Sequence, residues 1–234
     1  TIEEIKARTT ELIRPPVANI NQAVIVFAIK NPEPNMILLD KILVMAEHYD
    51  IDIVLCFNKV DLVSEDTIKS MKERYKNTGY KTIFCSTKND IGLDEIREIL
   101  RNKVTVFAGP SGVGKSSILN EVQDGLQLKT GEISQKIKRG KHTTRHSELL
   151  ELECGGYVAD SPGFTSLSLD FIDKEELRHL FPEFEKYIDD CKFNNCMHIN
   201  EPSCGVKNAV ENEEINKERY DSYLYFINEK DTRR

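Results

Sequence analysis

The sequence has 234 residues, of which 39% are hydrophobic, and its formal net charge is −7. This length suits one domain of typical size together with a smaller one. The negative charge argues against a protein that binds nucleic acid with its whole surface, although it is compatible with a local basic patch. No apolar stretch is long enough to cross a membrane, and because three of residues 1–6 are charged we expect no signal peptide.

Strand and helix patterns alternate along the first half of the chain. Residues 1–19 predict a short amphipathic helix and then an extended connector, because Pro15 and Pro16 cannot continue a helix. Beyond them, continuous apolar runs typical of buried parallel strands alternate with segments of helical spacing. The predicted strands are 22–29, 52–57, 81–85 and 104–108, and the predicted helices are 35–49, 64–78, 91–100 and one that begins at Ser116. The alternation predicts an α/β fold with a mainly parallel sheet.

A polar segment and a hairpin follow. Residues 131–146 contain glycine and few apolar side chains, so we expect them to be mobile. Between residues 136 and 146 there are five Lys or Arg residues and no acidic one. The two short runs 148–151 and 155–159 predict a hairpin.

The pattern changes beyond Ser168. Residues 173–190 predict an acidic helix, residues 191–204 hold a cysteine cluster, and residues 205–230 predict a charged amphipathic helix. We therefore expect a second, smaller domain. The predicted division is an N-terminal helix and connector (1–19), a central α/β domain (20–168) and a C-terminal helical domain (169–234).

A glycine-rich motif follows the predicted strand 104–108. Residues 109–116 have the pattern G-x-x-x-x-G-K-S and lead into a helix, which is the context that a phosphate-binding loop requires. Its glycines let backbone N–H groups surround phosphate oxygens, its lysine neutralises the outer phosphates, and its serine hydroxyl binds Mg²⁺. The alternative is a glycine-rich turn without a ligand. The residues expected at the phosphates are Gly109, Pro110, Ser111, Gly112, Val113, Gly114, Lys115, Ser116 and Ser117.

Two further motifs follow the second and third predicted strands. Asn58, Lys59, Val60 and Asp61 match N-K-x-D, and Ser86, Thr87 and Lys88 resemble the S-A-K loop whose backbone contacts the guanine oxygen. An aspartate carboxylate accepts two hydrogen bonds from guanine, whereas adenine lacks this donor pair. By itself N-K-x-D would more often be a solvated turn. Beside a phosphate loop it indicates a guanine nucleotide.

The γ-phosphate is expected to contact residues from the later loops. Asp160 and Gly163 match D-x-x-G, in which the aspartate holds Mg²⁺ and the glycine N–H meets the γ-phosphate. The alternative is an ordinary turn with Pro and Gly. Thr143 or Thr144 should close over Mg²⁺, and we favour Thr144.

The residue after Gly163 is Phe164, where Ras-like proteins have a glutamine that orients water. Phe164 cannot orient water, so hydrolysis is expected to be slow or to use another group. His142, next to the threonines, is the candidate for this role. The alternative is a histidine that is simply solvated.

The order of these motifs differs from that of ordinary GTPases, in which the phosphate loop comes first and N-K-x-D comes late. Here N-K-V-D and S-T-K precede the phosphate loop, the threonines and D-S-P-G, which is a circular permutation. The chain resembles the RsgA family, also called YjeQ or YloQ, of bacterial circularly permuted GTPases. The resemblance covers nearly all residues and rests on 14–20 (RPPVANI), 58–61, 109–117, 140–145 (GKHTTR), 160–164 and the C-terminal Cys/His cluster.

The resemblance implies a circularly permuted P-loop GTPase domain over residues 20–168. It also implies GTP hydrolysis stimulated by the ribosome, in the maturation of the small ribosomal subunit, with contacts to its rRNA and release after hydrolysis. Members of the family normally carry an N-terminal RNA-binding OB-fold, which we do not find in this sequence.

The cysteines are distributed unevenly. Cys191, Cys196, His198 and Cys204 offer three thiolates and one imidazole within fourteen residues, which suits one structural Zn²⁺ in a tetrahedral site. Unpaired buried cysteines with a surface histidine are the alternative. Cys56 and Cys85 fall on predicted strands and are expected to pack. Reduced cysteines in a nucleotide-binding protein suggest the cytoplasm.

We therefore predict a cytoplasmic, monomeric GTPase that uses GTP/GDP, Mg²⁺ and Zn²⁺, with Lys115, His142 and Thr144 as its catalytic residues. One alternative is a GTP-dependent module that binds the ribosome and its rRNA with negligible hydrolysis, which Phe164 favours. An ATP-dependent kinase is disfavoured by Asp61. Because D-S-P-G leads directly into the C-terminal domain, we also expect the γ-phosphate state to reorient residues 169–234.

Overall fold

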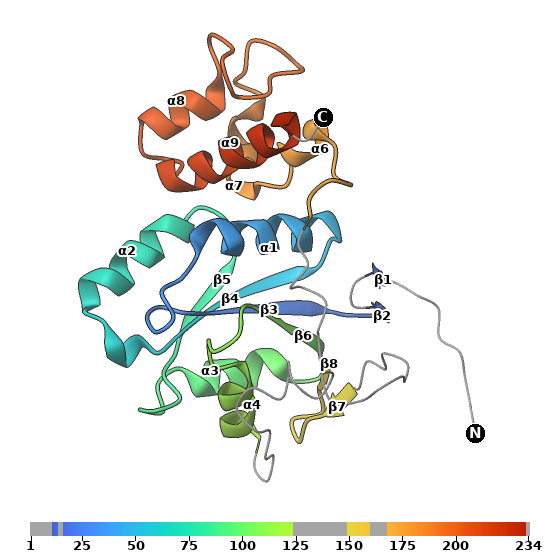
Figure 1. The fold of residues 1–234 in the computed structure, drawn as a ribbon, viewed down its shortest axis with the longest axis vertical. Coiled ribbons are helices and arrows are strands. Elements are labelled where there is room, and N and C mark those ends of the chain that lie inside the picture. The colour runs from blue at the N-terminus through green and yellow to red at the C-terminus, as the bar shows by residue number, and fades with distance from the viewer. Residues whose placement is uncertain (1–10, 14–15, 124–148, 160–167, 233–234) are drawn as a thin grey trace.

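The computed structural model describes residues 11–13, 16–123, 149–159 and 168–232. Its centre is a sheet covered by helices on both faces (Figure 1). Helices α1 (Met36–His48) and α2 (Glu65–Tyr75) cover one face, and α3 (Leu93–Leu100) and α4 (Lys115–Val122) cover the other. The C-terminal helices form a further layer on the outer side of α1.

The sheet has six strands among the described residues, in the order β5-β4-β3-β6-β8-β7. Neighbouring strands are parallel except for β7 and β8, which form the predicted antiparallel hairpin. The prediction of an α/β fold with a mainly parallel sheet is thus confirmed. The strands are β3 (Gln22–Ala28), β4 (Asp52–Asn58), β5 (Lys81–Phe84), β6 (Val104–Ala108), β7 (Leu149–Glu151) and β8 (Tyr157–Ala159).

Burial explains why these segments form strands. All seven residues of β3, the central strand, are buried, as its unbroken apolar run predicted. Its side chains alternate between two hydrophobic clusters. One lies under α1 and contains Ile25 and Phe27, and the other lies under α3 and α4 and contains Val24 and Val26.

The N-terminal segment differs from the prediction. Residues 1–19 were expected to begin with a helix, but Glu11–Ile13 (β1) pairs with Pro16–Ala18 (β2) as an antiparallel hairpin. The helix prediction is therefore wrong for residues 11–13. Pairing with β2 provides partners for the backbone groups of β1 that face it, in place of the internal bonds of a helix. The remainder of that predicted helix lies outside the described residues.

Each of the two helices predicted in the C-terminal part is divided in two. The segment 173–190 contains α6 (Lys174–Leu177) and α7 (Pro182–Ile188), because Pro182 favours a first helical position and cannot continue a helix from before it. The segment 205–230 contains α8 (Gly205–Glu211) and α9 (Lys217–Thr232). The break falls at Glu213, whose positive φ of 60° is not helical.

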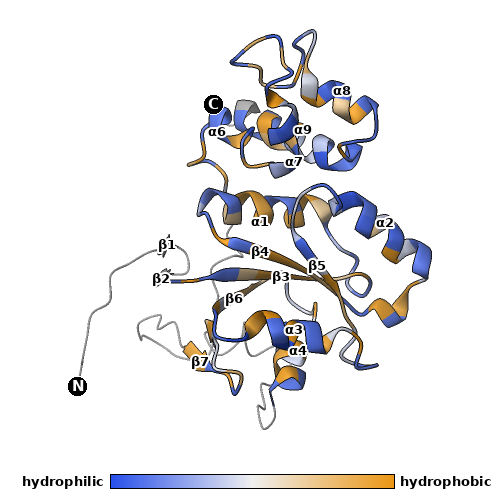
Figure 2. Cartoon of the chain, turned by 180° about the vertical axis from the view of Figure 1, so that it is seen from behind, coloured by the Kyte–Doolittle hydropathy of each residue, from blue (hydrophilic) through white to orange (hydrophobic). Residues whose placement is uncertain are grey.

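Helix α1 is buried on two sides, and it is largely hydrophobic along its length (Figure 2). Leu39 and Leu43 contact the sheet, whereas Val44 and Met45 belong to a third cluster with the C-terminal helices, which includes Phe181 and Tyr223. The C-terminal part therefore has a core of its own that is completed by α1. No described helix is long and apolar enough to cross a membrane.

Candidate nucleotide and metal sites

Four of the predicted loops start at one edge of the sheet. Asn58 is the last residue of β4, Ser86 follows β5 by two residues, and Gly109 directly follows β6. Asp160 comes directly after Ala159, the last residue of β8. Because β4, β5, β6 and β8 run parallel within one sheet, their carboxyl ends lie along the same edge, where ligands of such sheets bind.

The phosphate loop (residues 109–116) needs its glycines. A Cβ atom on Gly109, where φ is 134°, would lie 2.0 Å from the Val26 carbonyl oxygen. A Cβ atom on Gly114, where φ is 102°, would lie 2.2 Å from Nδ2 of Asn58. Other residues would therefore be strained at both positions and would push neighbouring groups away.

Two residues of this loop are the predicted contacts of the outer phosphates and Mg²⁺. Lys115, the first residue of α4, donates from Nζ to the carbonyl oxygens of Gly109 and Pro110, at 2.8 and 2.7 Å. The ammonium group is therefore held over the loop. Ser116 is buried in the first turn of α4, where the backbone N–H groups of the helix end favour an anion.

The base loop (residues 58–61) is bonded directly to the phosphate loop. Asn58 is 1% exposed, and its Nδ2 donates to the carbonyl oxygen of Val113 at 2.9 Å. Lys59 has a left-handed backbone with a φ of 66°, and its Nζ donates to the carbonyl oxygens of Gly112, at 2.8 Å, and of Asn31. Three loops from separate strands are thereby joined.

The carboxylate of Asp61 is oriented by the next loop. Ser86 Oγ donates to Asp61 Oδ1 at 2.6 Å, and Ser86 itself is fully buried. Its backbone is fixed by two bonds with Ile91, each of 3.0 Å. Of the two residues that follow it, Thr87 is half-buried and Lys88 is exposed. The carboxylate thus has a defined direction and remains partly open to solvent.

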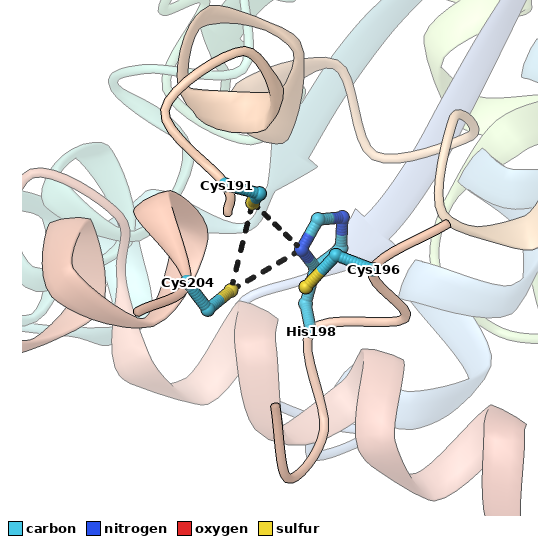
Figure 3. Close-up of side chains that lie close together, drawn as sticks. All are labelled: Cys191, Cys196, His198 and Cys204. Atoms are coloured by element: carbon cyan, nitrogen blue, oxygen red, sulfur yellow. Dashed lines mark hydrogen bonds between the residues drawn. The ribbon is translucent and has the colours of Figure 1, made fainter. Parts of the chain in front are cut away.

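The four predicted metal ligands come together in the C-terminal part (Figure 3). Their ligand atoms all lie within 4.8 Å of one another. Sγ of Cys191 lies 3.6 Å from Nδ1 of His198 and 3.8 Å from Sγ of Cys204, and Nδ1 of His198 lies 3.3 Å from Sγ of Cys204. Cys196 completes the group.

Burial shifts the pKa values of two of these groups. It raises the pKa of the Cys204 thiol to about 12 and lowers the pKa of the His198 imidazole to about 4. The imidazole is therefore neutral near pH 7, as a metal ligand must be. The thiol is protonated there, and a bound cation would be needed to displace its proton.

The loops around the cluster are held by polar contacts. The Glu201 carboxylate accepts from the backbone N–H groups of Met197, at 2.7 Å, and Ile199, at 2.9 Å. Tyr220 and Tyr223 of α9 donate their hydroxyl groups to the carbonyl oxygens of His198 and Met197, each at 2.6 Å. These contacts fix the ligand-bearing loop against α9.

Comparisons with known proteins agree with this arrangement. The family model described as "RsgA GTPase" matches residues 5–170. The chain belongs to the RsgA GTPase family. It is 50% identical to the small ribosomal subunit biogenesis GTPase RsgA of Clostridium acetobutylicum, over all of this chain and 81% of the relative. The corresponding protein of Alkaliphilus metalliredigens is 49% identical, over 97% of this chain and 78% of that relative.

Two solved structures resemble the fold closely. The crystal structure of YjeQ from Thermotoga maritima has a TM-score of 0.86 and 39% identity, covering 99% of this chain and 79% of that one. The structure described as YloQ, a circularly permuted GTPase, has a TM-score of 0.81 and 41% identity, covering 99% and 75%. The permuted RsgA fold is thus confirmed for this chain.

Several residues singled out in the sequence lie outside the described part of the chain. They are His142, Thr143, Thr144, Asp160, Gly163 and Phe164, together with the basic segment 136–146. Their expected roles in this RsgA-family chain stay predictions.

Two contacts at the nucleotide edge were not foreseen. They are the hydrogen bond from Ser86 Oγ to Asp61 and the bond from Lys59 to the carbonyl oxygen of Asn31. The bond to Asn31 could have been anticipated from the sequence. Residue 31 comes just after the central strand β3, and any loop there starts at the ligand-binding edge of the sheet.

Proposed function

We propose that this chain binds guanine nucleotides and hydrolyses GTP in the biogenesis of the small ribosomal subunit. The observation that carries the proposal is the direct bonding of the base loop to the phosphate loop, through Asn58 with Val113 and Lys59 with Gly112. A ligand at this edge meets a carboxylate at one end and a cationic, N–H-lined loop at the other. A guanosine phosphate has the complementary groups.

Guanine selection would depend on Asp61. One of its oxygens accepts from Ser86, and the carboxylate has further acceptor positions for the ring N–H and the exocyclic amine of guanine. Lys59 can lay its methylene groups against the base while its ammonium remains on the phosphate loop. Asn58 would set the spacing between base and phosphates. The loop of Ser86, Thr87 and Lys88 would contact the guanine oxygen.

The phosphates would lie on residues 109–117. Lys115 would exchange its two carbonyl partners for the β- and γ-phosphates, and the Ser116 hydroxyl would bind Mg²⁺. We assign Asp160 and Gly163 to Mg²⁺ and the γ-phosphate, and Thr144 (or Thr143) to the closed triphosphate state. We assign His142 to orienting the attacking water.

The cysteine cluster fits one structural Zn²⁺. With Zn–S near 2.3 Å and Zn–N near 2.1 Å, a tetrahedral ion separates two sulfurs by about 3.8 Å and a sulfur from a nitrogen by about 3.6 Å. Here the Sγ atoms of Cys191 and Cys204 are 3.8 Å apart, and Nδ1 of His198 lies 3.6 Å from the first and 3.3 Å from the second. All four ligands come from the protein, so a structural role suits the ion better than a catalytic one. We propose that residues 169–234 are the zinc-binding domain, 20–168 the GTPase domain and 1–19 a connector.

Removing this ion should unfold the loop that carries the ligands. A chelator is expected to release about one Zn²⁺ per chain and to expose residues 191–204, because short metal-bound segments lack a core of their own. Metal analysis combined with hydrogen exchange measures both effects. Unchanged protection of this segment in metal-free protein would contradict the structural role.

The relatives are named as biogenesis GTPases of the small ribosomal subunit. We therefore propose this subunit and its rRNA as partners of a monomeric, cytoplasmic protein, with the basic segment 136–146 contacting RNA phosphates.

Steady-state GTP turnover with and without purified small subunits tests the function. We expect slow turnover alone and an increase of about 100- to 10,000-fold with subunits, the gain typical of positioning one catalytic group. Large subunits serve as the control. Binding without any stimulation would instead favour the second candidate, a GTP-dependent ribosome-binding module, which the phenylalanine at position 164 suggests.

A further inference from the structure

We infer that the last turn of α2 positions the guanine-binding carboxylate of Asp61, so that Arg74 and Tyr75 help to select the base. The inference rests on the proposed role of Asp61 in guanine binding. It concerns two residues that lie at the far end of a helix from the base loop.

Helix α2 is a direct continuation of the base loop. Asp61 lies in a short 3₁₀ turn, Val60–Leu62, and only Val63 and Ser64 separate this turn from α2. Both junction residues are hydrogen-bonded, with Val63 N donating to the Val60 carbonyl oxygen at 3.4 Å and the Ser64 carbonyl oxygen accepting from Thr67 N at 3.2 Å. The direction of the helix therefore constrains the turn that bears Asp61.

The first part of α2, residues 65–70, contains no buried residue. Arg74 and Tyr75 are the only buried residues of α2, and both lie in its last turn. Elsewhere the helix is half-buried or exposed. Just before the last turn, Met71 packs against the cluster under α1, and Lys72 makes a cation–π contact with the Phe84 ring at 5.3 Å. The position of α2 thus depends largely on its last turn.

That last turn is attached to a buried carboxylate. Asp40 of α1 is fully buried and accepts from Arg74 Nη2 and from the Tyr75 hydroxyl, each at 2.9 Å. The same carboxylate accepts from Arg219 Nη1 at 2.8 Å and from Ser222 Oγ at 2.5 Å, both on α9. The C-terminal helix therefore fixes the group that holds α2.

Apolar packing does not replace these bonds. A cleft of about 420 Å³ lies beside the last turn of α2, and its lining includes Arg74, Asn77, Asn216 and Lys217. Since this space is open, the end of α2 gains little from apolar contact with the C-terminal helices. Its attachment combines the packing of Tyr75 and Met71 in the cluster under α1 with the polar bonds of Arg74 and Tyr75 to Asp40.

Loosening the attachment of the last turn should let α2 tilt, and a tilt would displace Asp61 at the other end. An 11-residue helix is about 16 Å long, so a tilt of about 5° moves one end by about 1.4 Å relative to the other. A shift of that size is enough to break a hydrogen bond to the base. Phosphate binding should suffer less, because the phosphate loop is followed by α4 and not by α2.

The test compares GDP with inosine diphosphate, which lacks the exocyclic amine that Asp61 would accept from. Calorimetric dissociation constants for both nucleotides give the preference for guanine. We expect Arg74→Met to lower this preference by about 5- to 10-fold, within the usual range of coupling between sites. Tyr75→Phe, which removes only one hydroxyl, should lower it in the same direction and covers the case in which Arg74→Met does not fold.

Lys41→Met is the matched control. Lys41 lies on α1 beside Asp40 and pairs with Glu229 of α9 at 3.1 Å, but it makes no bond to α2. It should keep the wild-type preference. An unchanged preference in folded Arg74→Met, or an equal loss in Lys41→Met, would overturn the positioning role. Asp61→Asn distinguishes guanine binding by Asp61 from the positioning of Asp61 by α2. An unaltered preference for guanine in that variant would refute guanine binding by Asp61 itself.

Discussion

Replacing Asp61 with asparagine is expected to lower the affinity for GDP by about 100- to 10,000-fold. The carboxylate would accept two hydrogen bonds from guanine, and bonds to a charged group contribute about 1.5–3 kcal/mol each. An amide in its place presents N–H donors to the ring edge, where xanthine has a second carbonyl group. The variant should therefore gain affinity for xanthosine diphosphate, and fluorescence titration with both nucleotides measures the exchange.

Asp66→Asn is the control for this substitution. Asp66 is exposed in the first turn of α2, so it shares the charge and the neighbourhood of Asp61 without facing the loops. It should bind GDP as the wild type does. Tight GDP binding by Asp61→Asn would mean that the base lies elsewhere.

Arg219→Met is expected to lower the free energy of unfolding by about 3–5 kcal/mol, the usual cost of removing one partner from a buried ion pair. Arg219 is fully buried and bonds to Asp40 at 2.8 Å and to Glu183 at 2.7 Å. Its guanidinium also lies 4.8 Å from the ring of Phe181. Methionine fills similar space but leaves both carboxylates short of a partner. Urea denaturation of wild type and variant measures the difference.

A second charged residue of α9 provides the comparison. Lys217 is exposed and pairs with Asp221 one turn away, at 2.7 Å. Because exposed pairs contribute little, Lys217→Met should change stability by less than about 1 kcal/mol. Equal effects of the two substitutions would show that the buried ion pairs of Arg219 with Asp40 and Glu183 stabilise the fold no more than an exposed pair does.

The ion pairs of Asp40 with Arg219 and Arg74 should make the free energy of unfolding fall in acid. Burial alone would raise the pKa of Asp40, but Arg219 and Arg74 together outweigh it and hold this pKa below its usual value. A carboxyl group with a depressed folded-state pKa stabilises the fold above its unfolded pKa, near 3.9. That contribution is lost as the pH falls below about 4.

The buried bonds of Asp40 also bear on movement of the C-terminal part. We expected the γ-phosphate state to reorient residues 169–234. Any such movement relative to α1 would have to break the bonds from Arg219 and Ser222 to Asp40. A change confined to the segment that follows β8 would leave them intact.

Local patterns carried most of the sequence prediction. The strand β3 was evident from an unbroken apolar run, and the base and phosphate loops from motifs only four and eight residues long. The metal cluster was evident because all its ligands fall within fourteen residues. In each case the information lies close together along the chain.

Contacts between distant residues could not be predicted in this way. Asp40 and Arg219 are 179 positions apart. For each of these charged side chains, exposure to solvent is the ordinary expectation from sequence. The break between α8 and α9 was missed for a related reason. Its residues, 212–216, are mostly polar and include no glycine or proline, so the sequence does not mark the interruption that the positive φ of Glu213 shows.

One guanine nucleotide is expected to span the base loop and the phosphate loop. Hydrogen exchange of backbone amides during a GDP titration tests it most directly. We predict that residues 58–61 and 109–116 gain protection together, with the same midpoint and one GDP per chain. Protection of the phosphate loop alone, with the base loop unchanged at saturation, would contradict it.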